Sequence, residues 1–147
     1  MERMRRLRQS KAIRDMVEET RVSKKDLIYP IFVAEGENIK THVDSMPGVY
    51  QYSIDNLDPI LKEINDSKIS GLLMFGVPKQ KDEVGSSAYD DNGITQNAIR
   101  YIKSKYPNMI VVADVCLCEY TSHGHCGVVD GDEILNDATL PLLCKMS

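Results

Sequence analysis

Three short apolar runs alternate along the chain with segments whose hydrophobic residues recur at helical spacing. The runs LIYPIFV (27–33), GLLMFGV (71–77) and MIVVADVCL (109–117) each predict a strand. Pro30 is awkward inside a central strand, because proline has no backbone N–H to donate to a ladder. The second run is apolar without interruption, which is typical of a strand that is buried on both faces.

Amphipathic patterns follow these runs. The first predicted helix is marked by four apolar residues on one face: Leu57, Ile60, Leu61 and Ile64. Asp55 and Asn56 are candidates for its N-terminal cap. A second helix is marked in the same way by three residues: Ile94, Ala98 and Ile102. Residues 132–146 predict a third helix, in which Pro141 is acceptable only within the first turn.

The order of these elements, strand and helix in alternation, predicts βαβ units and a parallel sheet. Each predicted strand is followed by a long loop: 34–53, 78–93 and 118–132. In parallel α/β folds the loops that follow the strands build the active site. We therefore expect one functional face made of these three loops.

Charge is unevenly spread along the chain. Residues 1–22 hold seven Lys/Arg against four Asp/Glu, while residues 23–147 carry a formal net charge of −7. We expect a partly helical basic arm over 1–22 that docks on a partner, followed by one domain over 23–147. The arm lacks the aromatic residues that would favour binding to nucleic acid. No apolar run reaches the ~20 residues that span a bilayer, and no secretory signal is evident, so we expect a soluble cytoplasmic protein.

The stretch from Asp114 to Cys126 concentrates three of the four cysteines. In the cytoplasm thiols stay reduced, which favours metal binding or catalysis over disulfides. Because side chains alternate along a strand, Asp114, Cys116 and Cys118 should share one face. The glycines Gly124 and Gly127 let the loop return Cys126 to the same place. Three thiolates suit Zn²⁺ and leave a fourth coordination position open, as in catalytic zinc sites.

Other interpretations of the cluster remain open at this stage. Cys116 and Cys118 also fit small core residues or a redox C-x-C pair, although no helix N-terminus is present to lower a thiol pKa. His123 or His125 would complete a tetrahedral site. Cys144 is expected in the core of the third helix, and a further histidine is expected in a solvated loop: His42.

The segment DVCLCEYTSHGHCG (114–127) resembles the zinc-site segment of the porphobilinogen synthase family, also called delta-aminolevulinic acid dehydratase. The resemblance continues, in order, through LIYPIFVAEG, SMPGVYQYS, GVPKQKDEVGSSAYDDNGITQNAIRYIK and NDATL. The basic RMRRLR also resembles the N-terminal arm of that family. The likeness thus covers nearly the whole chain.

The resemblance implies an α/β fold, the TIM (β/α)8 barrel, with this chain covering the arm and about the first three βα units. It implies a zinc-dependent hydro-lyase that condenses two 5-aminolevulinate molecules to porphobilinogen, with loss of water, in heme biosynthesis. It also implies a homo-octamer and admits an additional allosteric Mg²⁺ in the full-length enzyme. Carried over by residue, Cys116, Cys118 and Cys126 are the zinc ligands, and Asp114 is an active-site aspartate.

One departure from the family is large. The family uses two lysines that form Schiff bases with the substrates, in barrel strands beyond Ser147, and none of the eleven lysines here stands in such a motif. We therefore expect this chain to be inactive alone. A non-enzymatic zinc-binding module and a redox protein are the alternative functions. A displaceable ligand on the metal indicates catalysis, a closed site indicates a structural role, and a redox pair binds no metal.

Overall fold

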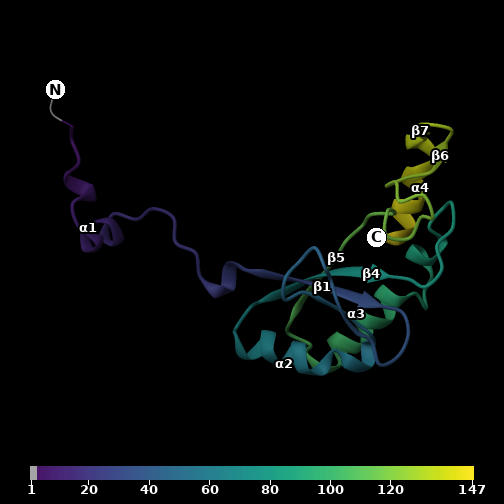
Figure 1. Ribbon diagram of the computed structural model, residues 1–147, viewed down its shortest axis with the longest axis horizontal. Helices are drawn as coiled ribbons and strands as arrows, with labels where there is room; N and C mark the ends of the chain where they lie inside the picture. The colour runs from purple at the N-terminus through teal and green to yellow at the C-terminus, as the bar shows by residue number, and fades with distance from the viewer. Residues whose placement is uncertain (1–2) are drawn as a thin grey trace.

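A five-stranded sheet forms the centre of the protein, in the order β2-β3-β1-β4-β5. The computed structural model describes residues 3–147 (Figure 1). The three predicted strands are β1 (Ile28–Ala34), β4 (Gly71–Val77) and β5 (Ile110–Ala113), and they pair in parallel. The predicted βαβ series is therefore confirmed.

The first long loop adds two strands that the hydrophobic pattern did not predict. These are β2 (Lys40–His42) and β3 (Tyr50–Tyr52); β3 runs parallel to β1, and β2 runs antiparallel to β3. Pairing of β3 with β1 is confined to Phe32 and Val33. Pro30 therefore lies where β1 has a strand neighbour on one side only, which is the edge-like setting that proline tolerates.

The first two predicted helices both cover one face of the sheet (Figure 1). They are α2 (Asp58–Asp66) and α3 (Ile94–Lys105). Their apolar faces pack on the alternate strand residues that point toward them, and together these side chains form the main core, which we call the sheet core. Its buried members are Ile31, Val33, Tyr52, Leu57, Leu61, Ile64, Leu72, Met74, Ala98, Ile102 and Met109.

The predicted N-terminal cap of α2 is wrong. Leu57 occupies the cap position, without a side-chain hydrogen bond, after the short 3-10 helix η3 (Ile54–Asn56). Asp55 instead accepts a hydrogen bond from the backbone N–H of Asn38 at 2.9 Å, and the Asn56 amide donates to the Ile39 carbonyl at 3.2 Å. Asp55 and Asn56 thereby fasten the first loop to η3.

The third strand is shorter than the predicted 109–117. Its last ladder pair joins Ala113 to Met74, after which the Asp114 N–H still bonds the Met74 carbonyl at 3.1 Å. Beyond that point the chain leaves the sheet, because Leu117 is buried in a different place. The period-two argument that placed Asp114, Cys116 and Cys118 on one strand face is therefore wrong in its mechanism.

The C-terminal part forms a second, smaller cluster, which we call the loop core. It buries Leu117, Tyr120 and Ala88, the last from the 3-10 helix η4 (Ser86–Tyr89). A hairpin of β6 (Val129–Asp130) and β7 (Glu133–Ile134) leads into α4 (Asn136–Met146). This helix packs on the loop core through Leu142, Leu143 and Met146. The loop core thus joins the second and third long loops to α4.

Two predictions for this helix need correction. It begins at Asn136, so Pro141 lies in its interior and not in its first turn. The carbonyl that loses its partner belongs to Asp137, which is exposed and open to water, so the loss is tolerated. Cys144 is exposed and not part of the core, because α4 packs through the other side of the helix.

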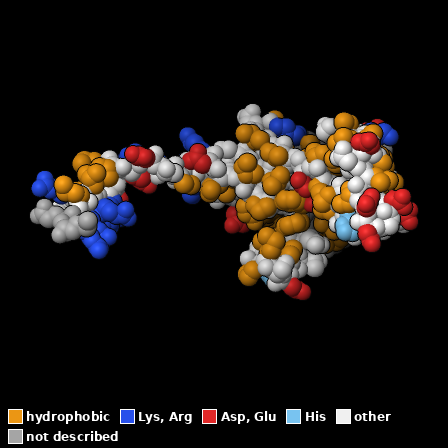
Figure 2. All heavy atoms as spheres, turned by 90° about the horizontal axis from the view of Figure 1, so that it is seen from above, with side chains coloured by type: hydrophobic (Ala, Val, Ile, Leu, Met, Phe, Trp, Pro, Cys, Tyr) orange, Lys and Arg blue, Asp and Glu red, His pale blue; other side chains and the backbone are white. Residues whose placement is uncertain are grey.

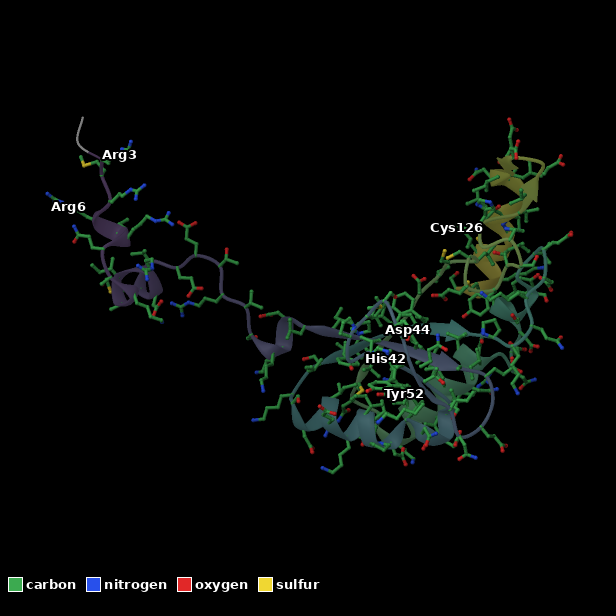
Figure 3. The ribbon with its side chains drawn as sticks, viewed as in Figure 1. Arg3, Arg6, His42, Asp44, Tyr52 and Cys126 are labelled. Carbon is green, nitrogen blue, oxygen red and sulfur yellow. The ribbon has the colours of Figure 1, made fainter. Side chains whose placement is uncertain are left out.

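His42 is exposed, as expected, but it lies on β2 and not in a loop. Its Nδ1 is 3.6 Å from a carboxylate oxygen of Asp44 (Figure 3). The His42 ring meets that of Tyr50 edge-on. These are surface contacts of the first loop, far along the chain from the cysteines.

The second face of the sheet is apolar, and no helix of residues 3–147 covers it. Its rows are given by the strand register: Ile28, Gly71 and Ile110; Pro30, Leu73 and Val112; Phe32 and Phe75. Ile110 is 57% exposed, and the rings of Phe32 and Phe75 stack at 5.1 Å. Figure 2, which looks onto the side away from α2 and α3, shows hydrophobic side chains gathered across the middle of the body. Within the described residues, β5 also has no strand on its outer edge.

The N-terminal arm extends away from the sheet (Figure 1). It is partly helical, as predicted, with η1 (Arg6–Arg8) and α1 (Lys11–Met16), and a further 3-10 helix, η2 (Lys24–Asp26), precedes β1. Arg3 and Arg6 project outward from it (Figure 3). Met1 and Glu2 lie outside the described residues. Across residues 3–147, no helix has the length and apolar character needed to cross a membrane.

Candidate metal centre

Three thiols converge just beyond the carboxyl end of β5. The sulfur atoms of Cys116, Cys118 and Cys126 all lie within 4.8 Å of one another, and those of Cys116 and Cys118 are 3.2 Å apart. Cys126 lies between the sheet and the C-terminal helix (Figure 3). Within residues 3–147 this is the one group of three His, Cys, Asp or Glu side chains with ligand atoms so close together. The group can hold a metal ion.

A tight turn, and not a strand, brings Cys116 and Cys118 together. The N–H groups of Tyr120 and Thr121 both bond the Leu117 carbonyl at 2.9 Å. Leu117 and Tyr120 are buried on either side of Cys118. The cysteine is therefore carried by a turn whose two ends are fixed in the loop core.

The Tyr120 side chain ties this turn to α3. Its hydroxyl is 2.7 Å from the Thr95 hydroxyl, in the first turn of that helix, and both residues are buried. Gly76 of β4 lies directly beneath the pair. A Cβ at this position would overlap both hydroxyl oxygens, so glycine is required for this close approach.

Backbone contacts join the second loop (78–93) to the third loop (118–132), which carries Cys118 and Cys126. Asp82 and Thr121 form an isolated parallel bridge, and the Ser122 N–H bonds the Asp82 carbonyl at 2.8 Å. The Asp82 carboxylate in turn accepts hydrogen bonds from the N–H groups of Val84 and Ser86, and its bonds with Ser86 lower its pKa. Two of the three predicted loops therefore form one connected unit.

His123 is engaged within this unit. Its Nδ1 accepts a hydrogen bond from the His125 N–H at 3.1 Å, so the proton lies on Nε2, which donates to the Glu83 carbonyl at 3.1 Å. Both ring nitrogens are used, which removes His123 as a fourth metal ligand in this structure. His125 is exposed, and its ring does not belong to the thiol group found in residues 3–147.

Burial and neighbouring thiols raise the pKa values of Cys118 and Cys126. Burial, and then the neighbouring Cys116 and Cys126, raise the pKa of Cys118 to about 12. Cys116 likewise raises the pKa of Cys126 through a side-chain hydrogen bond and its charge. Three thiolates in so small a space repel one another, and a bound cation removes that repulsion. Ionising all three thiols is therefore unfavourable unless a cation compensates their charge, as expected for a metal site.

Two carboxyl groups adjoin the thiols. Asp114 was predicted as a site residue and directly follows β5. Glu119 was not assigned a role from sequence, yet its pKa is raised to about 7, by burial and then by the charge of Asp114, against the lowering effects of the Gly76 N–H and Lys81. One of its oxygens is buried without a hydrogen-bond partner in the described residues. The signal for Glu119 was its place beside Cys118; the turn that buries it was not evident from the sequence.

The thiols of the site can bind a soft cation, and the neighbouring carboxyl groups can accept or donate protons. An open hollow of about 400 Å³ is lined in part by Glu83, His123 and His125. Asp114 and the thiols come after the carboxyl end of β5. In parallel α/β folds, ligands bind at this end of the sheet.

Comparison with known proteins identifies the family. The family model for delta-aminolevulinic acid dehydratase matches residues 1–147. A delta-aminolevulinic acid dehydratase of Halalkalibacterium halodurans is 54% identical over 143 residues, covering 97% of this chain and 44% of the relative. One of Ruminiclostridium josui is 47% identical over 147 residues, covering 100% of this chain and 72% of the relative.

A solved structure agrees with the sequence comparisons. Delta-aminolevulinic acid dehydratase (porphobilinogen synthase) from Toxoplasma gondii ME49, in complex with the reaction product porphobilinogen, matches with a TM-score of 0.91 and 34% identity. The match covers 99% of this chain and 42% of that one. The predicted fold class, the N-terminal part of a TIM (β/α)8 barrel, is thereby confirmed. This chain spans less than half the length of the Halalkalibacterium relative, and it belongs to the delta-aminolevulinic acid dehydratase family.

Proposed function

We propose that these 147 residues supply the metal-binding side of a porphobilinogen synthase, which condenses two 5-aminolevulinate molecules to porphobilinogen with loss of water in heme biosynthesis. The observation that carries the proposal is the convergence of three thiols within 4.8 Å beside Asp114, at the rim of a parallel sheet. The family assignment supports this reaction, and the thiol geometry supports a metal-binding role for this segment.

The metal is proposed to be Zn²⁺, held by Cys116, Cys118 and Cys126, because thiolates are the ligands that zinc prefers in such number. Zinc bound there supplies Lewis acidity toward a substrate carbonyl or amine. Asp114 acts beside it as a proton donor or acceptor, or as a hydrogen-bond partner to a substrate amine. Since His123 is held by Glu83 and His125, three protein ligands leave a position for substrate, which favours a catalytic over a structural site.

The arm over 1–22 is proposed to dock on another copy of the chain, in a cytoplasmic homo-octamer as the family resemblance implies, with an allosteric Mg²⁺ in the full-length enzyme. Exposed apolar residues on the arm support docking on protein: Met4, Leu7, Met16 and Val22. Its basic charge complements the acidic remainder of the chain. Removing 1–22 from the assembled enzyme should reduce its sedimentation coefficient to that of a smaller oligomer, whereas an unchanged oligomer would contradict this docking.

The metal site is tested by X-ray absorption at the zinc edge of the purified chain. We expect one zinc per chain with three sulfur ligands at about 2.3 Å. The variant Cys144→Ser serves as a control, because its thiol is exposed on α4 and apart from the site. A first shell dominated by nitrogen would assign the metal to the histidines and reject the thiol site.

The reaction is tested by complementation in trans. The chain is co-expressed with the part of the Halalkalibacterium halodurans relative that lies outside the matched region, and porphobilinogen formation from 5-aminolevulinate is assayed. We expect product from the pair and none from the pair that carries Cys126→Ser.

The chain alone is the second arm of that experiment. We expect it to form neither porphobilinogen nor an imine that borohydride can trap, because amine nucleophiles change the reaction route itself and metal and carboxylate do not replace them. A stoichiometric borohydride adduct on one of its eleven lysines, together with turnover, would contradict this division of roles.

A further inference from the structure

We propose that Tyr120 is a positioning residue of the metal centre: its buried hydroxyl, held by Thr95, fixes the turn that presents Cys118 to Cys116 and Cys126. The inference rests on the proposed metal-binding function and extends it to two residues outside the ligand set. Tyr120 is 1% exposed and Thr95 is 5% exposed, so both hydroxyls are shielded from water.

Breaking the buried hydrogen bond is costly, because neither hydroxyl can bond to water instead. The two oxygens lie 2.7 Å apart, and breaking the bond leaves a buried polar group unsatisfied. The pair also rests on the backbone of β4 at Gly76, where no side chain separates it from the sheet. The hydroxyl pair therefore joins three elements: the turn that carries Cys118, α3 and β4.

The backbone transmits this anchor to the thiol. Tyr120 lies two residues after Cys118, and its N–H closes the turn on the Leu117 carbonyl at 2.9 Å. Leu117, on the other side of Cys118, is fully buried in the same loop core. Cys118 is thus held between two buried anchors, and the tyrosine anchor carries a buried side-chain hydrogen bond.

Rotation of the turn would move Cys118 relative to the other two thiols. Cys116 follows the end of β5, and Cys126 is exposed beyond the second-loop contacts, so neither is fastened by Tyr120. Loss of the hydroxyl anchor should therefore weaken metal binding without removing a ligand. Groups that orient metal ligands from outside the coordination shell commonly change metal affinity by about 10- to 100-fold.

The experiment compares metal affinity among four variants of the full 147-residue chain. Zn²⁺ affinity is measured by competition with a chromophoric chelator, and Co²⁺ provides a thiolate charge-transfer band that reports ligand geometry. We expect Tyr120→Phe and Thr95→Val each to weaken Zn²⁺ binding by about tenfold and to alter the Co²⁺ band. Thr95→Ser keeps the hydroxyl and should retain the affinity of the parent chain. Combining Tyr120→Phe with Thr95→Val should weaken binding no further than either change alone.

Ser53→Ala is the matched control. Ser53 is fully buried and its hydroxyl accepts a hydrogen bond from the Ile39 N–H at 2.8 Å, but it lies in the first loop, away from the thiols. It should lower stability while leaving Zn²⁺ affinity and the Co²⁺ band unchanged. Should Tyr120→Phe fail to fold, the contrast between Thr95→Val and Thr95→Ser decides.

The outcomes separate the two levels of the proposal. A parent chain that binds no metal overturns the proposed function. A parent chain that binds Zn²⁺ through its thiols, with Thr95→Val and Tyr120→Phe binding equally tightly, overturns only the positioning role. An equal loss of affinity in Ser53→Ala would likewise reduce Tyr120 to a contributor to general stability.

Discussion

The sheet core and the loop core are built on different principles. The sheet core collects residues that recur along strands and helices, such as Leu61 of α2 and Leu72 of β4. The loop core collects Leu117, Tyr120 and Ala88 from two separate loops and closes them with α4. The first core makes a stable frame, and the second places three thiols to within 4.8 Å. The sheet core therefore provides stability and the loop core positions the thiols, and the two clusters meet at Gly76.

The largest effect expected from this division is on stability. Leu61 is fully buried between α2 and the sheet, so Leu61→Ala should lower the free energy of unfolding by about 2–5 kcal/mol. Urea denaturation followed by circular dichroism measures the change, with Leu140→Ala, half exposed on α4, as the control. Zn²⁺ affinity of the folded molecules should stay that of the parent chain. A parallel loss of affinity would show that the two cores are not separable.

Gly76→Ala adds a Cβ where the two cores meet. The added Cβ would overlap the hydroxyls of Thr95 and Tyr120, so we expect a loss of about 1–3 kcal/mol, as for overpacking of a core. Metal affinity should fall as well, in contrast to Leu61→Ala. Gly71→Ala, in the same strand, is the matched control, because the nearest atom to its Cβ would be 3.3 Å away, on Ile110. Equal Zn²⁺ binding in the two glycine variants would argue against a junction at Gly76.

Proton release distinguishes the loop core from the sheet core without mutation. The pKa of Cys118 is raised to about 12, chiefly by burial, so the thiol is protonated at neutral pH and must lose its proton to bind a cation as thiolate. Zn²⁺ affinity should therefore rise with pH, by up to about tenfold per pH unit for each proton displaced. Calorimetry in buffers of different ionisation enthalpy counts the protons. Binding without proton release would exclude the thiols as ligands.

The smallest effect is expected at the fourth cysteine. Cys144 is exposed on α4, so Cys144→Ser should change the free energy of unfolding by less than about 0.5 kcal/mol. One metal per chain should remain, as measured by native mass spectrometry. A halved metal content would place Cys144 in a site between chains and would blur the distinction between the two clusters.

The sequence predicts the sheet core well, because the spacing of its hydrophobic residues follows the buried faces of the strands and helices. The runs at β1 and β4 and the helical faces through Leu61 and Ala98 fall where they were expected. Pro141 does not end α4, because a single missing N–H is tolerated where the freed carbonyl is exposed.

The loop core is less predictable for a physical reason. Its members come from segments without periodicity, so nothing local indicates that Leu117 turns away from the sheet while Val111 stays in it. The cysteine spacing indicated a metal site through an alternation that does not occur. Glu119 was passed over because its burial depends on that same turn. Residue types indicated the chemistry, whereas the placement of the side chains required the tertiary structure.

The close spacing of the three cysteines has a thermodynamic consequence. Cys116, Cys118 and Cys126 lie within eleven consecutive residues, so an unfolded chain can wrap the same thiols around a cation. A ligand stabilises a fold only by the difference between its affinities for the folded and unfolded states. Zinc bound here should therefore add less to the melting temperature than its dissociation constant suggests. A chelator would then loosen the loop and leave the sheet folded, so that metal content and foldedness become independent variables.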